Sequence, residues 1–298
     1  MGVSLALPKS ATGNHHLRLE LNPFPLVLRN AREILAQTGL RWGVMGLMMW
    51  WLVATMFQMA AILVATNVMG LQKAQVGLVL LPVVVCQGLG CFLAGYVSRN
   101  RLELGLVPFG AAGMCITSLV MWMVLPGSSE IAAQGSVNGS MTIRLSLLMA
   151  LIALTTGFFI VPLEAFVVGS ADASVRGGVW STSNVLTAFG MMAGAGIVAL
   201  IMRVENEVRV IFLVAAILMA VTGAVLCWRF PRIPLRFMVL CFFRTFYRTS
   251  ASGLENIPKT GGALLAINHQ SYLDGILLVS LIDRPVRFIM SSMVYNTW

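Results

Sequence analysis

The chain between Trp42 and Trp228 is mostly apolar, and only short polar segments interrupt it. A helix needs ~20 apolar residues to cross a bilayer, and six runs reach that length. In lipid the backbone must satisfy its own hydrogen bonds, so each run is predicted to be a helix rather than a strand. The predicted spans are about 42–69, 76–97, 104–125, 145–169, 179–202 and 210–228.

Two shorter apolar patterns flank these runs. Leu26–Leu35 places apolar residues at helical spacing with Arg29, Arg32 and Glu33 between them, which predicts a short helix along the cytoplasmic face. Leu235–Arg248 is basic and aromatic, and at about 14 residues it is too short to cross the bilayer. It is predicted to lie in the headgroup region as an interfacial helix.

From Ser250 onward the pattern changes. Ala263–Ile267 reads as a short apolar strand, Asn268–Asp274 as a polar connection and Gly275–Ile282 as a helix. This order is typical of an α/β domain. The predicted fold is therefore an all-α polytopic membrane protein followed by the start of an α/β domain. Its expected segments are a cytoplasmic leader (1–41), six spans (42–229), an interfacial helix (230–249) and the α/β segment (250–298).

Composition supports a membrane protein. Of the 298 residues, 58% are hydrophobic and 10% charged, and the mean hydropathy is +0.87. Soluble domains carry about 25% charged residues, so membrane lipid is predicted to be the main solvent of this chain. The net charge is +9, but the basic residues form no cluster with interleaved aromatic residues. We therefore expect no nucleic-acid partner.

Lysine and arginine gather on alternate loops, which predicts the orientation by the positive-inside rule. The enriched side marks the cytoplasm, and an even number of spans places both termini there. The enriched set is Lys9, Arg18, Arg29, Arg32, Arg41, Arg99, Arg101, Arg176, Arg229, Arg232, Arg236, Arg244 and Arg248. The other side holds Lys73, Arg144, Arg203 and Arg209, the last two offset by Glu205 and Glu207.

No metal site or disulfide framework is expected. All five cysteines lie in or beside apolar runs, and none forms a Cys-x-x-Cys pair. His15 and His16 are adjacent in the polar leader, with no carboxylate or cysteine at the spacing of metal ligands.

Candidate chemistry concentrates in the connection that contains His269 and Asp274. If this loop curls, the carboxylate can bind one imidazole nitrogen, and the other nitrogen can take a proton from a hydroxyl nucleophile. The substrate can supply that hydroxyl. The predicted catalytic residues are therefore His269 and Asp274, with Asn268 and Ser271 as candidate substrate-binding residues.

The stretch Gly253–Asp274 resembles the glycerophospholipid acyltransferase family, whose hallmark is His, four residues, Asp. The resemblance implies that His269 activates the glycerol hydroxyl of a lysophospholipid, as in 2-acylglycerophosphoethanolamine acyltransferases, and that Asp274 orients it. The hydroxyl then attacks an acyl thioester of acyl carrier protein or coenzyme A, the co-substrate, with no other cofactor. The later family motifs that bind the acceptor phosphate are absent, so this chain is expected to be inactive alone.

The membrane part resembles one half of a major facilitator superfamily transporter. Gly95, Ser98, Arg99 and Arg101 follow the family's cytoplasmic loop after the second span, with Ser98 where aspartate is usual. Six spans are half of the usual twelve. The order of the two parts resembles bacterial fusions of a lysophospholipid transporter to an acyltransferase, located in the inner membrane. It implies that the chain is truncated at both ends and lacks the N-terminal half of the transporter as a partner.

Glu164 is a carboxylate inside the fourth predicted span, and intramembrane ionisable residues are often functional. It could bind a coupling cation or a headgroup amine, or pair with Arg144 or Arg176. Two alternative functions stay open. One is a facilitator-type transporter of another solute with an inert C-terminal piece. The other is a membrane-anchored acyltransferase without transport.

Overall fold

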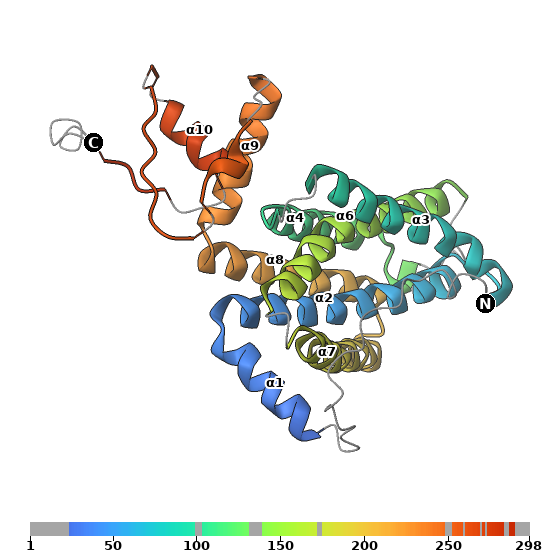
Figure 1. Cartoon of the computed structure of the whole chain (residues 1–298). Helices are drawn as coiled ribbons and strands as arrows, with labels where there is room; N and C mark the ends of the chain where they lie inside the picture. The colour runs from blue at the N-terminus through green and yellow to red at the C-terminus, as the bar shows by residue number, and fades with distance from the viewer. Residues whose placement is uncertain are drawn as a thin grey trace, which may run out of the picture.

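The computed structural model describes residues 24–98, 103–130, 139–171, 175–247, 252–258, 260–268, 270–271, 273–282 and 286–289 (Figure 1). Long helices dominate it, and no strand occurs in these ranges. The elements are α1 (Phe24–Ala36), α2 (Thr38–Leu63), the π-helical η2 (Val64–Val68), α3 (Lys73–Ser98), α4 (Leu106–Val124), α6 (Gly139–Ser170), α7 (Arg176–Val204), α8 (Val208–Arg229), α9 (Arg232–Phe246), the 3-10 turn η3 (Leu254–Asn256) and α10 (Leu273–Leu281).

Six of the described helices are long and apolar enough to cross a membrane, which confirms the predicted number. They are α2 with η2, α3, α4, α6, α7 and α8. Several extend past the apolar run that predicted them. α2 begins at Thr38, ahead of the predicted Trp42, because hydropathy marks the lipid-facing length of a helix and not the point where its hydrogen bonding begins.

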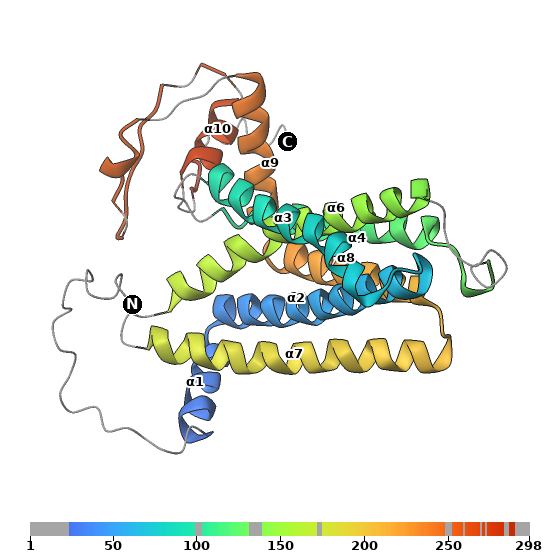
Figure 2. The same cartoon turned by 90° about the vertical axis from the view of Figure 1, so that its right-hand side faces the viewer.

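The core of the bundle lies between α2, α4, α6 and α8, where Met56, Phe159 and Phe212 are almost completely buried. α3 and α7 lie at opposite edges (Figure 2). Their outer faces expose large apolar side chains, such as Phe92 at 68% and Phe189 at 60%. Exposure of this kind over a whole helix face would be unfavourable in water and suits contact with lipid.

The packing partners of α2, α3 and α4 correspond to those of α6, α7 and α8. α3 packs mainly on α6 and α7 mainly on α2, while α4 contacts α6 as α8 contacts α2. The close approaches repeat as well: Gly90 of α3 lies on the backbone at Leu154 of α6, and Gly190 of α7 lies on the backbone at Met48 of α2. A side chain at either glycine would overlap the facing carbonyl. The pattern of packing in α2–α3–α4 is thus repeated in α6–α7–α8.

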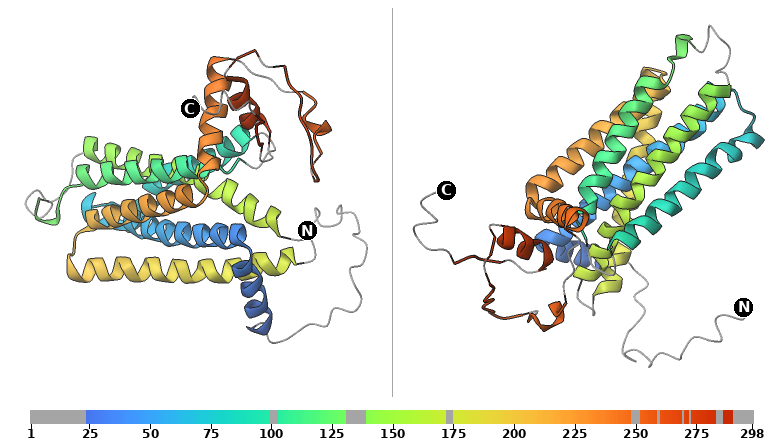
Figure 3. Two further views of the ribbon diagram at one scale, coloured as in Figure 1. Left: turned by 90° about the vertical axis from the view of Figure 1, so that its left-hand side faces the viewer. Right: turned by 90° about the horizontal axis from the view of Figure 1, so that it is seen from above.

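α1 and α9 run crosswise to the bundle helices at one end, where α2 begins and α8 ends (Figure 3). Both helices were predicted, and their helical structure is confirmed. α9 carries two apolar stripes. The inner stripe is buried and its Phe237 ring lies edge-on to Phe109 of α4, with centroids 5.3 Å apart. The inner stripe consists of Phe237, Leu240 and Phe243, and the exposed outer stripe of Leu235, Met238, Phe242 and Phe246.

The C-terminal segment corrects one prediction. The strand expected at Ala263–Ile267 is not formed, and Leu264 is 84% exposed. A strand requires a partner whose backbone groups complete its hydrogen bonds, and the described residues provide none. The helix expected after it is present as α10, which packs against α9.

Candidate functional site

Asp274 lies in the first turn of α10 and closes the loop that precedes the helix. Its Oδ2 atom accepts hydrogen bonds from the backbone N–H of Gln270, at 2.7 Å, and of Ser271, at 2.8 Å. Hydrogen bonds from two N–H groups to one carboxylate oxygen fix the side chain in place, since bonds to a charged acceptor are strong. Gln270 and Ser271 are therefore tied to the first turn of α10.

Ser271 completes this arrangement from the other direction. Its Oγ atom accepts a hydrogen bond from the backbone N–H of Leu273 at 3.2 Å, and the Asp274 N–H donates to the Ser271 carbonyl at 3.0 Å. The Ser271 hydroxyl thus caps the start of α10, and the Asp274 carboxylate in turn accepts from the Ser271 N–H. This capping role was not predicted from the sequence. Its signal was present, because Ser-x-x-Asp directly precedes an apolar run.

The predicted general base, His269, lies outside the described residues, so its role stays a prediction. Its neighbours are described. Asn268 is exposed in the loop, and Gln270, which follows His269 in the chain, is one of the two residues bonded to Asp274. The Asp274 carboxylate is therefore bonded to the residue that follows His269 in the chain.

Apolar contacts hold α10 in place. Ile282, just after the helix, is 5% exposed, and the ring of Phe288 lies beside Gly275. α10 also packs against α9, which joins it to the end of the bundle (Figure 1). The loop closed by Asp274 is thus positioned at the end of the bundle where α8 ends.

Comparison with known proteins identifies this segment. Residues 248–298 match the acyltransferase family model. The acyltransferase match includes Asn268, Ser271 and Asp274. A stretch of the chain is also 36% identical over 63 residues to an uncharacterized protein of Mycobacterium leprae, covering 18% of this chain and 17% of that protein.

Two further relatives give the same picture. Uncharacterized proteins of Mycobacterium tuberculosis and Mycobacterium bovis are each 38% identical over 63 residues, which is 18% of this chain and 18% of theirs. The match spans less than a fifth of each relative's length. No solved structure matches the chain. The molecule therefore combines an acyltransferase-like C-terminal segment with six helices fit to cross a membrane.

The other predicted site residues lie apart from this loop. Glu164 is half-buried on α6, near Cys91 of α3. The expected alternative of an ion pair with Arg144 or Arg176 is not formed in the described part of the chain, and the Arg176 guanidinium instead donates to the Ala171 carbonyl at 3.4 Å.

The predicted transporter loop is described only in part. A side chain at Gly95 would meet open space, and the Ser98 hydroxyl donates to the Ala94 carbonyl of its own helix at 2.7 Å. Arg99 and Arg101 lie outside the described residues.

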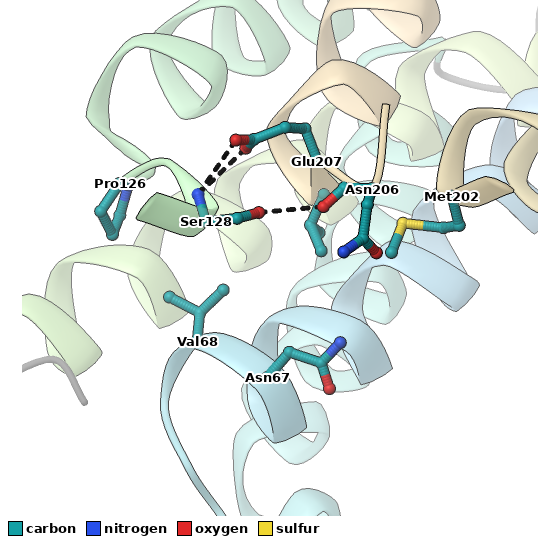
Figure 4. A pocket seen from close by; sticks show the side chains of 8 residues that line it. Asn67, Val68, Pro126, Ser128, Met202, Asn206 and Glu207 are labelled. Atoms are coloured by element: carbon teal, nitrogen blue, oxygen red, sulfur yellow. Dashed lines mark hydrogen bonds between the residues drawn. The ribbon is translucent and has the colours of Figure 1, made fainter. Parts of the chain in front are cut away.

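A polar pocket of about 260 Å³ is lined by Asn67, Ser128, Asn206 and Glu207 among others (Figure 4). It lies beside the end of α4 and the turn between α7 and α8, at the end of the bundle away from α9. There the Glu207 carboxylate accepts from the backbone N–H of Ser128 at 3.1 and 3.2 Å and faces Arg209 Nε at 3.5 Å. The Ser128 hydroxyl donates to the Asn206 carbonyl at 2.9 Å. These contacts join the end of α4 to the α7–α8 turn. Within the described ranges no cluster of His, Cys, Asp and Glu could hold a metal ion.

Proposed function

We propose that this chain belongs to a system that re-acylates lysophospholipid at the cytoplasmic surface of a bacterial inner membrane. The observation that carries the proposal is the acyltransferase match over residues 248–298, which contains the loop closed by Asp274. That loop is joined through α9 to one end of six apolar helices. An acyltransferase held there would meet membrane lipid as its substrate.

The proposed reaction transfers an acyl group from a thioester of acyl carrier protein or coenzyme A. His269 removes the proton from the free glycerol hydroxyl of the lysophospholipid, and the oxygen attacks the thioester carbonyl. The carbon–sulfur bond breaks, and the proton passes to the departing thiolate. Asp274, fixed by its two backbone donors, holds the imidazole in the tautomer that accepts this proton. Asn268 is proposed to contact the acceptor, and no other cofactor is required.

α9 is proposed to lie in the membrane interface. Its direction across the bundle and its exposed stripe of Leu235, Met238, Phe242 and Phe246 support this placement. An apolar stripe of this kind inserts at the boundary of headgroups and acyl chains. α9 meanwhile contacts α4 through Phe237 and also packs against α10. Both chain termini would then lie on the cytoplasmic side.

We further propose that the bundle is one half of a facilitator-type lysophospholipid transporter. The repeat of three helices favours transport over simple anchoring, because transporters of this class are assembled from inverted three-helix repeats. The partner would be an N-terminal half, against which this bundle rocks. Glu164 would bind the headgroup amine or a coupling cation from its half-buried position on α6.

Acyl transfer is tested in membranes that contain the full-length protein, supplied with lysophospholipid and a radiolabelled acyl thioester. His269→Ala should lower the rate by roughly 10²- to 10⁴-fold, since a general base contributes about that much. His15→Ala, the same change in the N-terminal leader, is the matched control and should leave the rate unchanged. Full activity in the His269→Ala protein would refute the proposed mechanism.

Transport is tested separately by uptake of a fluorescent lysophospholipid into vesicles. Glu164→Gln should reduce uptake while acyl transfer to lipid added directly to the cytoplasmic side continues. Unaltered uptake in Glu164→Gln would remove this residue from the proposal. Absence of uptake by the unchanged protein, with acyl transfer intact, would favour the membrane-anchored acyltransferase.

A further inference from the structure

An apolar slot of about 140 Å³ opens where α9 leaves the bundle. Its floor contains the buried residues Val107 and Leu163, and the rings of Phe166 and Phe230 are half-buried in its walls. Every wall residue is apolar. The residues that line the slot are Gly39, Gly43, Leu104, Val107, Pro108, Leu163, Phe166, Leu226, Phe230, Ile233 and Pro234.

Two glycines shape the side of the slot formed by α2. A Cβ added to Gly39 would lie 3.3 Å from Phe166 Cζ, and one added to Gly43 would lie 2.9 Å from a Val167 methyl group. Their missing side chains leave room beside the Phe166 ring. Water is a poor occupant of this space, because a bound water needs two to four polar partners and the wall residues offer no polar side chain.

Three arginines adjoin lining residues of the slot in the chain: Arg41 lies between Gly39 and Gly43, Arg229 precedes Phe230 and Arg232 precedes Ile233. The guanidinium carbons of Arg41 and Arg229 each lie 6.0 Å from the centre of the Trp42 ring. None of these three arginines forms an ion pair in the part of the chain that the structure describes. The Trp42 indole N–H is buried and also lacks an acceptor there. Three arginines and the Trp42 N–H donor thus lie close in the chain to residues that line the apolar slot.

We infer that this slot binds the acyl chain of a single-chain phospholipid, with its phosphate at Arg41 and Arg229. The end of the acyl chain would fill the apolar space between Phe166 and Phe230, where each buried methylene strengthens binding by roughly fourfold. The phosphate would receive charge-assisted hydrogen bonds from the guanidinium groups. The slot has room for part of one acyl chain, which is why a lipid with a single chain is proposed as its occupant.

The inference deepens the proposed function, on which it rests for the identity of the lipid as lysophospholipid. It assigns a holding site for that substrate at the junction of the bundle and α9, apart from the loop closed by Asp274. The site lies within one bundle, between α2, α4, α6, α8 and α9, and needs no contribution from a partner half. Binding there therefore does not depend on acyl transfer.

The test uses the full-length protein in detergent micelles with a lysophosphatidylethanolamine that carries a photoreactive diazirine near the end of its chain. After irradiation, the labelled residues are mapped by mass spectrometry. We expect label on Val107, Phe166 or Leu226, and competition by unlabelled lysophospholipid. A monoacylglycerol probe with the same chain but no phosphate should label these residues at least about tenfold less, the loss expected for charged hydrogen bonds.

Two variants and two matched controls sharpen the test. Gly39→Leu fills the slot and should lower labelling at least about fivefold, the effect of excluding one or two methylenes. Gly196→Leu makes the same change at a glycine of α7 with open space around it, and should have no effect. Arg41→Gln with Arg229→Gln should abolish the preference for the phosphate-bearing probe, whereas Arg203→Gln, at the other end of the bundle, should not.

The outcomes separate this inference from the proposed function. Label spread over the outer faces of α3 and α7, or equal labelling by a diacyl phospholipid probe, would overturn the slot even if acyl transfer is normal. If Gly39→Leu does not fold, the arginine pair and the mapped residues decide the question. Slot labelling should persist in His269→Ala, so a failure of the catalytic proposal leaves the binding result standing.

Discussion

Charged side chains at the two ends of the bundle have different partners. At the end with the polar pocket, Glu207 binds the Ser128 N–H and Arg209, so that charge joins neighbouring helix ends (Figure 4). At the end with α9, Arg41 and Arg229 lie against Trp42 without an ion pair in the described residues. The first end is closed by its own contacts, whereas the second keeps positive charge available for an anionic ligand. The cytoplasmic leaflet is the anionic one, which favours placing α9 there.

The largest expected effect is all-or-none and tests which end faces the cytoplasm. In a chain whose native cysteines are replaced by alanine, Glu205→Cys should react with a membrane-impermeant maleimide in intact spheroplasts. Thr245→Cys, on α9, should react only after permeabilisation, because the bilayer shields that end. Both residues are exposed, so access to the side chain is matched. The reverse pattern would invert the proposed orientation and remove the acyltransferase segment from the cytoplasm.

The second prediction compares the rate of acyl transfer after removal of one carboxylate at each end of the bundle, Asp274 or Glu207. Asp274→Asn should lower acyl transfer about a hundredfold or more, because the amide no longer holds an imidazole in the required tautomer. Glu207→Gln, the equivalent change at the opposite end, should leave the rate within about twofold of the unchanged protein once protein amounts are equal. The measurement is the initial rate with saturating lysophospholipid. Equal losses in both variants would mean that acyl transfer reports bundle integrity rather than the Asp274 site.

A smaller effect on stability should appear at the opposite end. Glu207→Gln weakens the bonds to Ser128 and should reduce the free energy of unfolding by about 1–3 kcal/mol. Arg209→Gln removes only a partly exposed ion pair and should cost at most about 1 kcal/mol. Thermal unfolding of the purified protein in detergent measures both. An equal cost for the two substitutions would assign the stabilisation to the ion pair instead of the backbone contact.

The smallest effect concerns the helix cap. Ser271→Ala should destabilise the start of α10 by about 0.5–2 kcal/mol and speed hydrogen exchange at the Leu273 amide. Ser271→Thr keeps the hydroxyl and should restore protection. If Ser271→Thr restores the cap but not acyl transfer, Ser271 contacts the substrate as the sequence analysis expected. If both variants exchange like the unchanged protein, the hydroxyl does not stabilise α10.

The sequence predicted those elements that are encoded locally. Six apolar runs predicted six helices, because length and hydropathy alone decide whether a helix can cross a bilayer. The two crosswise helices were predicted from periodicity. The slot was not predicted, because Gly43, Pro108, Phe166 and Ile233 come from four different helices that meet only through packing.

The C-terminal segment shows both kinds of outcome. The spacing of His269 and Asp274 made a curled loop the condition for their contact, and the cap that Ser271 and Asp274 form at the start of α10 was overlooked. The strand at 263–267 was predicted from apolar composition. Its absence from the described structure follows from the lack of a pairing partner, which no local pattern can reveal.

α9 has a mechanical consequence. It contacts α4 through Phe237 and Phe109 and also packs against α10, so it connects the bundle to the helix that Asp274 begins. We expect a tilt of α4 to swing that carboxylate relative to the bilayer surface. If the bundle transports lysophospholipid as proposed, the rate of acyl transfer would then change with the movement of its helices.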